Sequence, residues 1–133
     1  MNEPRRLWTV ARANRSLPLV ARIAADAVAR AAELGRLQAQ RQSARREARE
    51  TIERQIAELE VELDRYSGEL AAMGCELKDP RQGLVDFPAR NGDRAICLCW
   101  AHGESAVAFW HPVETGFTGR KPVGDLPAST LGS

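Results

Sequence analysis

Apolar residues recur at alternating spacings of four and three along one stretch of the chain, the pattern of an a/d seam held for three heptads. The seam consists of Ile52, Ile56, Leu59, Leu63, Tyr66, Leu70 and Met73. Gly74 follows directly, and glycine most easily takes the left-handed conformation that ends a helix. The pattern therefore predicts a helix from about Ala44 to Met73.

A second helical pattern precedes this one and is richer in alanine. Its apolar positions are Leu17, Val20, Ala24, Ala27, Ala31 and Leu34. We expect Ser16 to cap this helix, with Pro18 tolerated in its first turn, and a short lead-in helix to run from Thr9 through Ala13. The turn between the long helices is predicted near Gln38–Ser43, although the absence of Gly and Pro there leaves one continuous bent helix as the alternative.

Two glycine-containing dipeptides in the C-terminal half predict tight turns between strands. A type I′ turn at Asn91-Gly92 would pair Val85 with Leu98 and Phe87 with Ile96. A turn at His102-Gly103 would pair Leu98 with Val107 and Ile96 with Phe109. The sequence thus predicts a three-stranded antiparallel meander over about residues 84–110.

Alternation along these strands separates two faces. The apolar face is predicted to carry Val85, Phe87, Ile96, Leu98, Trp100, Val107 and Phe109 and to pack on the helices. The other face is predicted to carry Leu84, Asp86, Cys97, Cys99, Ala106, Ala108 and Trp110. This second face has small and weakly polar side chains, so we expect the tail after His111, a ligand or another subunit to cover it.

The predicted fold is therefore α+β, a long antiparallel, coiled-coil-like helix hairpin followed by a small sheet. A chain of 133 residues is long enough for one core, so residues 1–133 are expected to form one domain. Its parts are a hairpin over about 9–74, a sheet subdomain over about 75–125 and a flexible tail at 126–133. Residues 1–50, 51–74 and 75–133 carry net charges of +6, −4 and −1. The opposite charges of the two helices either flank a shared seam or only solvate two exposed faces.

Composition limits the compartment and the partners. Three cysteines without a disulfide spacing indicate reduced thiols and a cytoplasmic protein. No apolar run has the length of a membrane span. Nucleic acid is not expected, because glutamates are interleaved with Arg41, Arg45, Arg46 and Arg49. The seam from Ile52 to Leu70 would leave apolar area exposed in a monomer, so a homodimer through the helices is predicted.

Several short blocks resemble a known family. They are LWTVARANRSLP at 7–18, GCELKD at 74–79, GLVDFPA at 83–89, LCW at 98–100, FWH at 109–111 and GFTGRKP at 116–122. In order and spacing they are similar to the uncharacterised prokaryotic family called domain of unknown function 2203. Ala11 and Arg12 stand where that family usually has two acidic residues. The resemblance implies no activity and no catalytic residues.

Candidate chemistry is concentrated around the last predicted strand. His111 and Glu114 could join Asp86 in a site for a divalent metal or an acid/base pair. Arg120, between glycines, could receive an anion, and Trp110 could floor the pocket beside Cys97 and Cys99. The two cysteines are otherwise interpreted as small buried hydrophobes. The predicted strand pairing argues against this site, because it places His111 on the core-facing side of the sheet, away from Asp86.

Two functions are therefore kept. The first is a non-enzymatic interaction module that works as a homodimer. The alternative is a small metal-dependent or anion-binding enzyme whose site is formed by Asp86, His111, Glu114 and Arg120. No cofactor is specified by any motif in the sequence.

Overall fold

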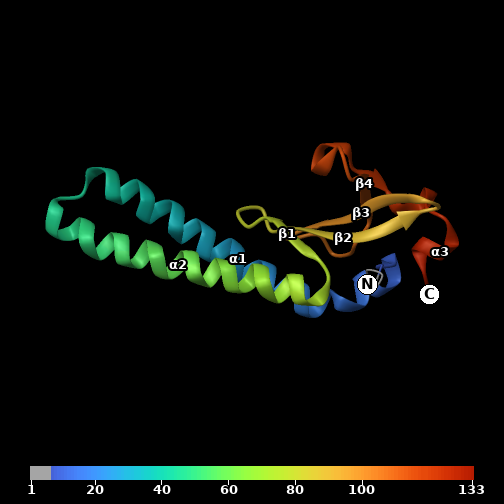
Figure 1. The fold of residues 1–133 in the computed structure, drawn as a ribbon, viewed down its shortest axis with the longest axis horizontal. Helices are drawn as coiled ribbons and strands as arrows, with labels where there is room; N and C mark the ends of the chain where they lie inside the picture. Colours follow the sequence, from blue (N-terminus) through green and yellow to red (C-terminus); the bar gives the residue numbers. More distant parts are fainter. Residues whose placement is uncertain (1–6) are drawn as a thin grey trace, which may run out of the picture.

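The computed structural model describes residues 7–133 and begins with two long antiparallel helices. Helix α1 spans Val10–Ser43 and helix α2 spans Arg46–Met73, so only two residues connect them (Figure 1). The predicted turn at 38–43 is thus displaced to residues 44–45. Residues 36–43 contain no Gly or Pro, and α1 continues until Ala44 adopts an extended conformation.

The start of α1 also differs from the prediction. Thr9 caps the helix, because its side-chain oxygen accepts a hydrogen bond from the Arg12 backbone N–H at 3.1 Å. The expected lead-in helix and the expected second helix are one continuous helix with Pro18 inside it. Ser16 is not a cap, and its hydroxyl donates to the Ala13 carbonyl instead. The end of α2 is as predicted, with Gly74 in the left-handed conformation at φ 95°.

The seam of α2 packs against α1 of the same chain. Ile56, Leu59, Tyr66 and Leu70 are buried there, and Ile52 and Leu63 are half-buried. The buried residues of α1, which pack against α2 and the sheet, are Ala13, Leu17, Val20, Ile23, Ala24, Ala27 and Ala31. One ion pair, Arg30–Glu62 at 3.2 Å, joins the basic helix to the acidic one. The seam therefore has a partner within the monomer, and the homodimer stays a prediction.

The helix pair extends beyond its packed part as an arm. The buried side chains of the pair end at Ala31 on α1 and Ile56 on α2. Beyond these residues the two helices project to one side of the sheet (Figure 1). Among residues 7–133, no helix is long and apolar enough to cross a membrane.

The predicted α+β class is confirmed, but the sheet has five strands where three were expected. In order across the antiparallel sheet they are β1 Glu76–Asp79, β2 Leu84–Asn91, β3 Arg94–Ala101, β4 Phe109–Pro112 and β5 Lys121–Pro122. Two 3-10 helices, η1 Gly116–Gly119 and η2 Val123–Asp125, and the short helix α3 Ala128–Leu131 complete the chain. The two additional strands are short and lie at the edges.

The β2–β3 hairpin has a register two residues away from the predicted one. Val85 pairs with Trp100 and Asn91 with Arg94, so the turn residues are Gly92 and Asp93. Gly92 has φ 62°, and Asp93 is not in the positive-φ region, which is the pattern of a type II′ turn and not of the predicted type I′. A shift of two residues keeps every side chain on its face, so the predicted faces of β2 and β3 remain correct.

The register of strand β4 against β3 also differs from the prediction, and this difference changes which side chains face the core. Leu98 pairs with Trp110 and Cys97 with His111, a shift of three residues from the prediction. An odd shift exchanges the two faces. Trp110 therefore joins the core, and Phe109 and His111 stand on the other face. The pairing that placed His111 toward the helices was wrong.

The cause is the loop over residues 102–108. The next strand was expected to follow the turn at His102-Gly103 directly, but the carboxylate of Glu104 accepts a hydrogen bond from the Ala101 backbone N–H at 2.7 Å and prolongs the turn. Further on, the Asn14 side chain binds both backbone groups of Val107, accepting from its N–H at 2.7 Å and donating to its carbonyl at 3.4 Å. Helix α1 thus holds this segment away from β3 and delays the start of β4.

The core lies between the inner face of the sheet and the base of the helix hairpin. Trp8 closes it at one end, packing edge-on to Phe87 with ring centroids 5.0 Å apart and donating to the Gly74 carbonyl at 3.1 Å. The C-terminal segment closes it at the other, because Leu126 and Thr130 are buried and the Thr130 hydroxyl bonds the Arg90 carbonyl. Residues 126–133 are thus packed on the domain, where a flexible tail was expected.

Candidate functional site

The outer face of the sheet carries a small polar cluster over strand β3. Asp86 on β2 and His111 on β4 are separated by β3, whose side chains between them are Cys97 and Cys99. Cysteine side chains are short, so the carboxylate and the imidazole can reach over the middle strand and meet. His111 Nε2 lies 3.1 Å from Asp86 Oδ1 and 3.2 Å from Oδ2.

The hydrogen bonds of His111 fix the arrangement of its protons. Its Nδ1 lies 2.8 Å from the Pro112 carbonyl oxygen, which can only accept a hydrogen bond, so Nδ1 carries a proton. Nε2 then faces the Asp86 carboxylate, and both side chains are buried. Two lone pairs would repel at that distance, so a proton or another cation must lie between Nε2 and the carboxylate.

Cys97 is the third member of the cluster. Its sulfur, an oxygen of Asp86 and a ring nitrogen of His111 all lie within 4.8 Å of one another. Burial, followed by the nearby charge of Asp86, raises the pKa of Cys97 to about 11, so the protein alone holds it as a thiol at neutral pH. Burial and the same carboxylate raise the pKa of Cys99 to about 12.

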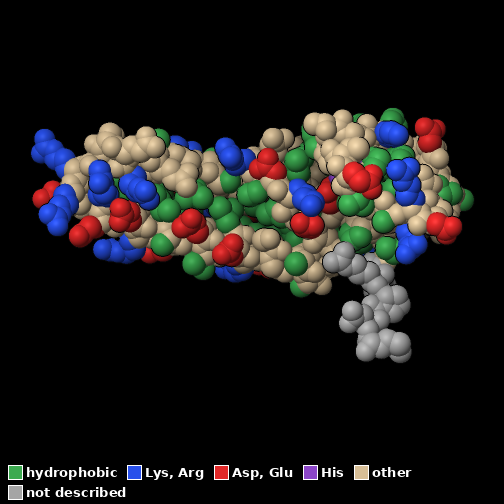
Figure 2. All heavy atoms as spheres, turned by 45° about the horizontal axis from the view of Figure 1, so that its top comes forward, with side chains coloured by type: hydrophobic (Ala, Val, Ile, Leu, Met, Phe, Trp, Pro, Cys, Tyr) green, Lys and Arg blue, Asp and Glu red, His purple; other side chains and the backbone are tan. Residues whose placement is uncertain are grey.

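A groove of about 1030 Å³ opens above this cluster. The end of α2, strand β1 and the outer face of β2–β4 form its sides, and η1 closes it through Gly116 and Phe117. Figure 2 shows hydrophobic side chains gathered in the middle of the molecule, where the helices meet the sheet. The cluster thus lies in a cavity of a size suited to a small molecule.

The comparison with known families bears on this part of the chain. The model of the family described as uncharacterized conserved protein (DUF2203) matches residues 6–123. The chain belongs to the DUF2203 family. Comparisons with curated proteins and with solved structures give no match. The blocks that carried the resemblance include Asp86 and His111 of the cluster, whereas Cys97 lies just before the block at 98–100.

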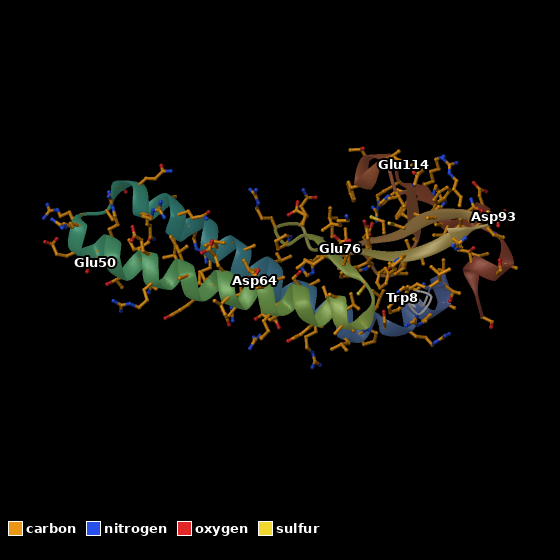
Figure 3. The ribbon with its side chains drawn as sticks, in the orientation of Figure 1. Trp8, Glu50, Asp64, Glu76, Asp93 and Glu114 are labelled. Carbon is orange, nitrogen blue, oxygen red and sulfur yellow. The ribbon has the colours of Figure 1, made fainter. Side chains whose placement is uncertain are left out.

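Only two of the five predicted site residues of this DUF2203 protein come together, namely Asp86 and His111. Glu114 is exposed beyond the end of β4, where it lies 3.9 Å from Arg94, and in Figure 3 it stands at the outer edge of the sheet. Trp110 is on the inner face, for the reason of register given above. Neither residue takes part in the cluster.

Arg120 has a different role from the predicted anion receptor. Its guanidinium donates to both carboxylate oxygens of Glu104, at 2.8 and 2.6 Å, and to the Cys99 carbonyl at 3.1 Å. The rings of Phe109 and Phe117 lie 4.2 and 4.7 Å from it. Burial would raise the pKa of Glu104, but the hydrogen bonds from Arg120 and the Ala101 N–H outweigh it and lower that pKa. The charge of Arg120 is thus neutralised, and the pair fastens η1 to the sheet.

Sequence reasoning placed Cys97 in the floor of the pocket but missed it as a ligating member of the site. The alternation of β3 did place it on the same face as Asp86, and that signal was available. What was lacking was His111 on that face, which depended on the register of β4. All three cysteines are free thiols, as expected, and Cys75 is buried in the core, apart from the cluster.

Proposed function

We propose that this domain binds a divalent transition-metal ion, zinc by preference, through Asp86, Cys97 and His111, and presents it to a small molecule in the groove. The observation that carries the proposal is the convergence of these three ligating groups within 4.8 Å. A set of one sulfur, one nitrogen and one oxygen suits zinc far better than magnesium or calcium. Three protein ligands also leave a fourth tetrahedral position for water or substrate, as in catalytic zinc sites.

The surroundings of His111 support a metal more than an acid/base role. A histidine that acts as a general base needs one ring nitrogen directed at the reacting group. In this domain Nδ1 is bound to the Pro112 carbonyl and Nε2 faces Asp86, so neither is directed into the groove. A histidine whose Nδ1–H donates to a backbone carbonyl and whose Nε2 faces a carboxylate is in the usual orientation of a metal ligand.

The properties of Cys97 also support a metal ligand more than a catalytic nucleophile. A nucleophilic cysteine needs a lowered pKa, and the pKa of Cys97 is raised to about 11. A metal ion would displace the thiol proton and neutralise the negative charges that Asp86 and the thiolate place close together. The chemistry available to the ion is activation of a bound water or polarisation of a carbonyl.

The test is metal analysis of protein purified without a chelator, followed by zinc titration against a competing chelator. We expect one ion per chain, and Cys97→Ala and His111→Ala should each weaken binding by at least tenfold. Glu114→Gln is the matched control, because Glu114 lies beyond the same strand and outside the cluster. With cobalt in place of zinc, a thiolate-to-metal absorption band should appear and be lost in Cys97→Ala. Absence of stoichiometric metal, or equal affinity in Cys97→Ala and the wild type, would refute the proposal.

A further inference from the structure

The exposed hydrophobic side chains of the domain are concentrated at the groove. Among residues 7–133 the large exposed ones are Leu7, Leu19, Val61, Val113 and Phe117. Three of these five line the groove, with Leu7 and Phe117 each 41% exposed and Val113 54% exposed. A few scattered hydrophobic residues on a surface are ordinary, but their gathering around one cavity indicates an apolar ligand surface.

The register places this surface next to the cluster. Cys97 lies between Pro88 and His111 across the strands, and the next outward-facing row toward the hairpin end contains Arg90 and Ala95. Val113 follows His111 by two residues, about 7 Å farther along the chain. Leu7 adjoins the free side of β2, where the Trp8 N–H donates to the Pro88 carbonyl at 2.9 Å. Apolar side chains therefore continue from the cluster in one direction.

The charged residues that line the groove indicate the charge of its ligand. Its charged residues are Arg12, Lys78, Arg90, Glu76 and Asp86. Glu76 pairs with Lys78 at 3.4 Å, and Asp86 belongs to the cluster. A bound divalent ion would balance Asp86 and the Cys97 thiolate, so the charge of Arg90 would leave this part of the groove positive. An anionic head group is complementary to such a groove.

We infer that the groove binds a small carboxylate with an aliphatic or aromatic tail. The carboxylate takes the open position of the metal, and the tail lies over Pro88, Val113 and Phe117. This inference rests on the proposed metal centre. The cavity of about 1030 Å³ has room for a tail of several carbon atoms beside the ion.

The experiment uses the zinc-loaded protein and two series of probes, straight-chain carboxylates and the corresponding hydroxamates, from two to eight carbons. Hydroxamates bind zinc through the same position and make weak ligands measurable. Each added methylene that is buried should lower Kd by about two- to fourfold, as measured by calorimetry. In Val113→Ser the eight-carbon probe should lose at least fivefold in affinity, whereas the two-carbon probe should be unchanged. Val113 is exposed, so this variant is expected to fold.

The matched control is Val61→Ser, an exposed valine on α2 that does not line the groove, and it should leave both probes unchanged. Two failures are distinguishable. If the protein binds no zinc, the metal centre itself is refuted. If it binds zinc but the affinity does not depend on chain length, or Val113→Ser has no effect on the long probe, the ligand class alone is overturned.

Discussion

The contact between Asp86 and His111 predicts an unequal response to removing either partner in the metal-free protein. Their side chains are 6% and 3% exposed, and the shortest distance between them is 3.1 Å. Breaking a buried pair costs about 3–5 kcal/mol when a charge is left without compensation. In His111→Ala the remaining group is a carboxylate whose neighbours in the described cluster are the thiols of Cys97 and Cys99, which are weak donors. The full cost of about 4–5 kcal/mol is therefore expected at pH 7.

Asp86→Ala should cost less, about 2–3 kcal/mol. The imidazole that remains keeps its bond to the Pro112 carbonyl, so it still has one hydrogen-bond partner. The double variant leaves no buried charge and should cost about 3–5 kcal/mol, less than the sum of the single changes. The coupling free energy in this double-mutant cycle is thus expected to be about 1–5 kcal/mol, with about 3 kcal/mol at the centre of that range.

Urea unfolding followed by circular dichroism, with EDTA present, measures these free energies. For a chain of this length, 1 kcal/mol corresponds to about 3–4 °C in Tm, which gives an independent check. The control cycle is Arg94→Ala with Glu114→Ala, an ion pair at 3.9 Å with both side chains about 70% exposed, whose coupling should stay below about 0.5 kcal/mol. An Asp86–His111 coupling as small as that, or a larger cost for Asp86→Ala than for His111→Ala, would refute the reasoning.

Three further predictions concern turns, pH and assembly. Gly92→Ala should lower the free energy of unfolding by about 1–2 kcal/mol, through the backbone φ of 62° alone. Gly83→Ala should lower it further in the same urea assay, because the new Cβ would also lie 2.6 Å from His102 Cβ. Equal costs for the two variants would contradict this. Burial raises the pKa of Cys75, Cys97 and Cys99 from 9.0 to about 11, 11 and 12, so the folded state favours the protonated thiols. The contribution of the protonated thiols to the free energy of unfolding should be fully present below pH 9 and be lost as the pH rises through 11. Cys97→Ala should reduce that loss, and an unchanged loss would argue against a raised pKa of Cys97. Sedimentation equilibrium of the wild type at micromolar concentration tests the predicted homodimer, which a concentration-independent mass of one chain would exclude. Leu63→Asp cannot decide this, because Leu63 packs within the core of the same chain and the change should unfold a monomer as well.

Local patterns in the sequence determined the elements themselves. The apolar spacing of α2, its end at Gly74 and the alternation of β2 and β3 all depend on residues close together in the chain. The side-chain periods of a helix and a strand follow from backbone geometry alone. For that reason even a hairpin register wrong by two residues kept Asp86 and Cys97 on the correct face.

Tertiary contacts decided which residues form the site and what the seam packs against. The face of β4 depends on the length of the 102–108 loop, which Asn14 on the distant helix α1 and the Glu104 carboxylate set. One odd shift of register brought His111 to Asp86 and sent Trp110 into the core. Likewise, an a/d seam predicts that a partner helix packs against it, but the pattern does not specify whether that helix comes from the same chain. Such outcomes depend on contacts between segments far apart in the sequence, and no local pattern of side chains encodes them.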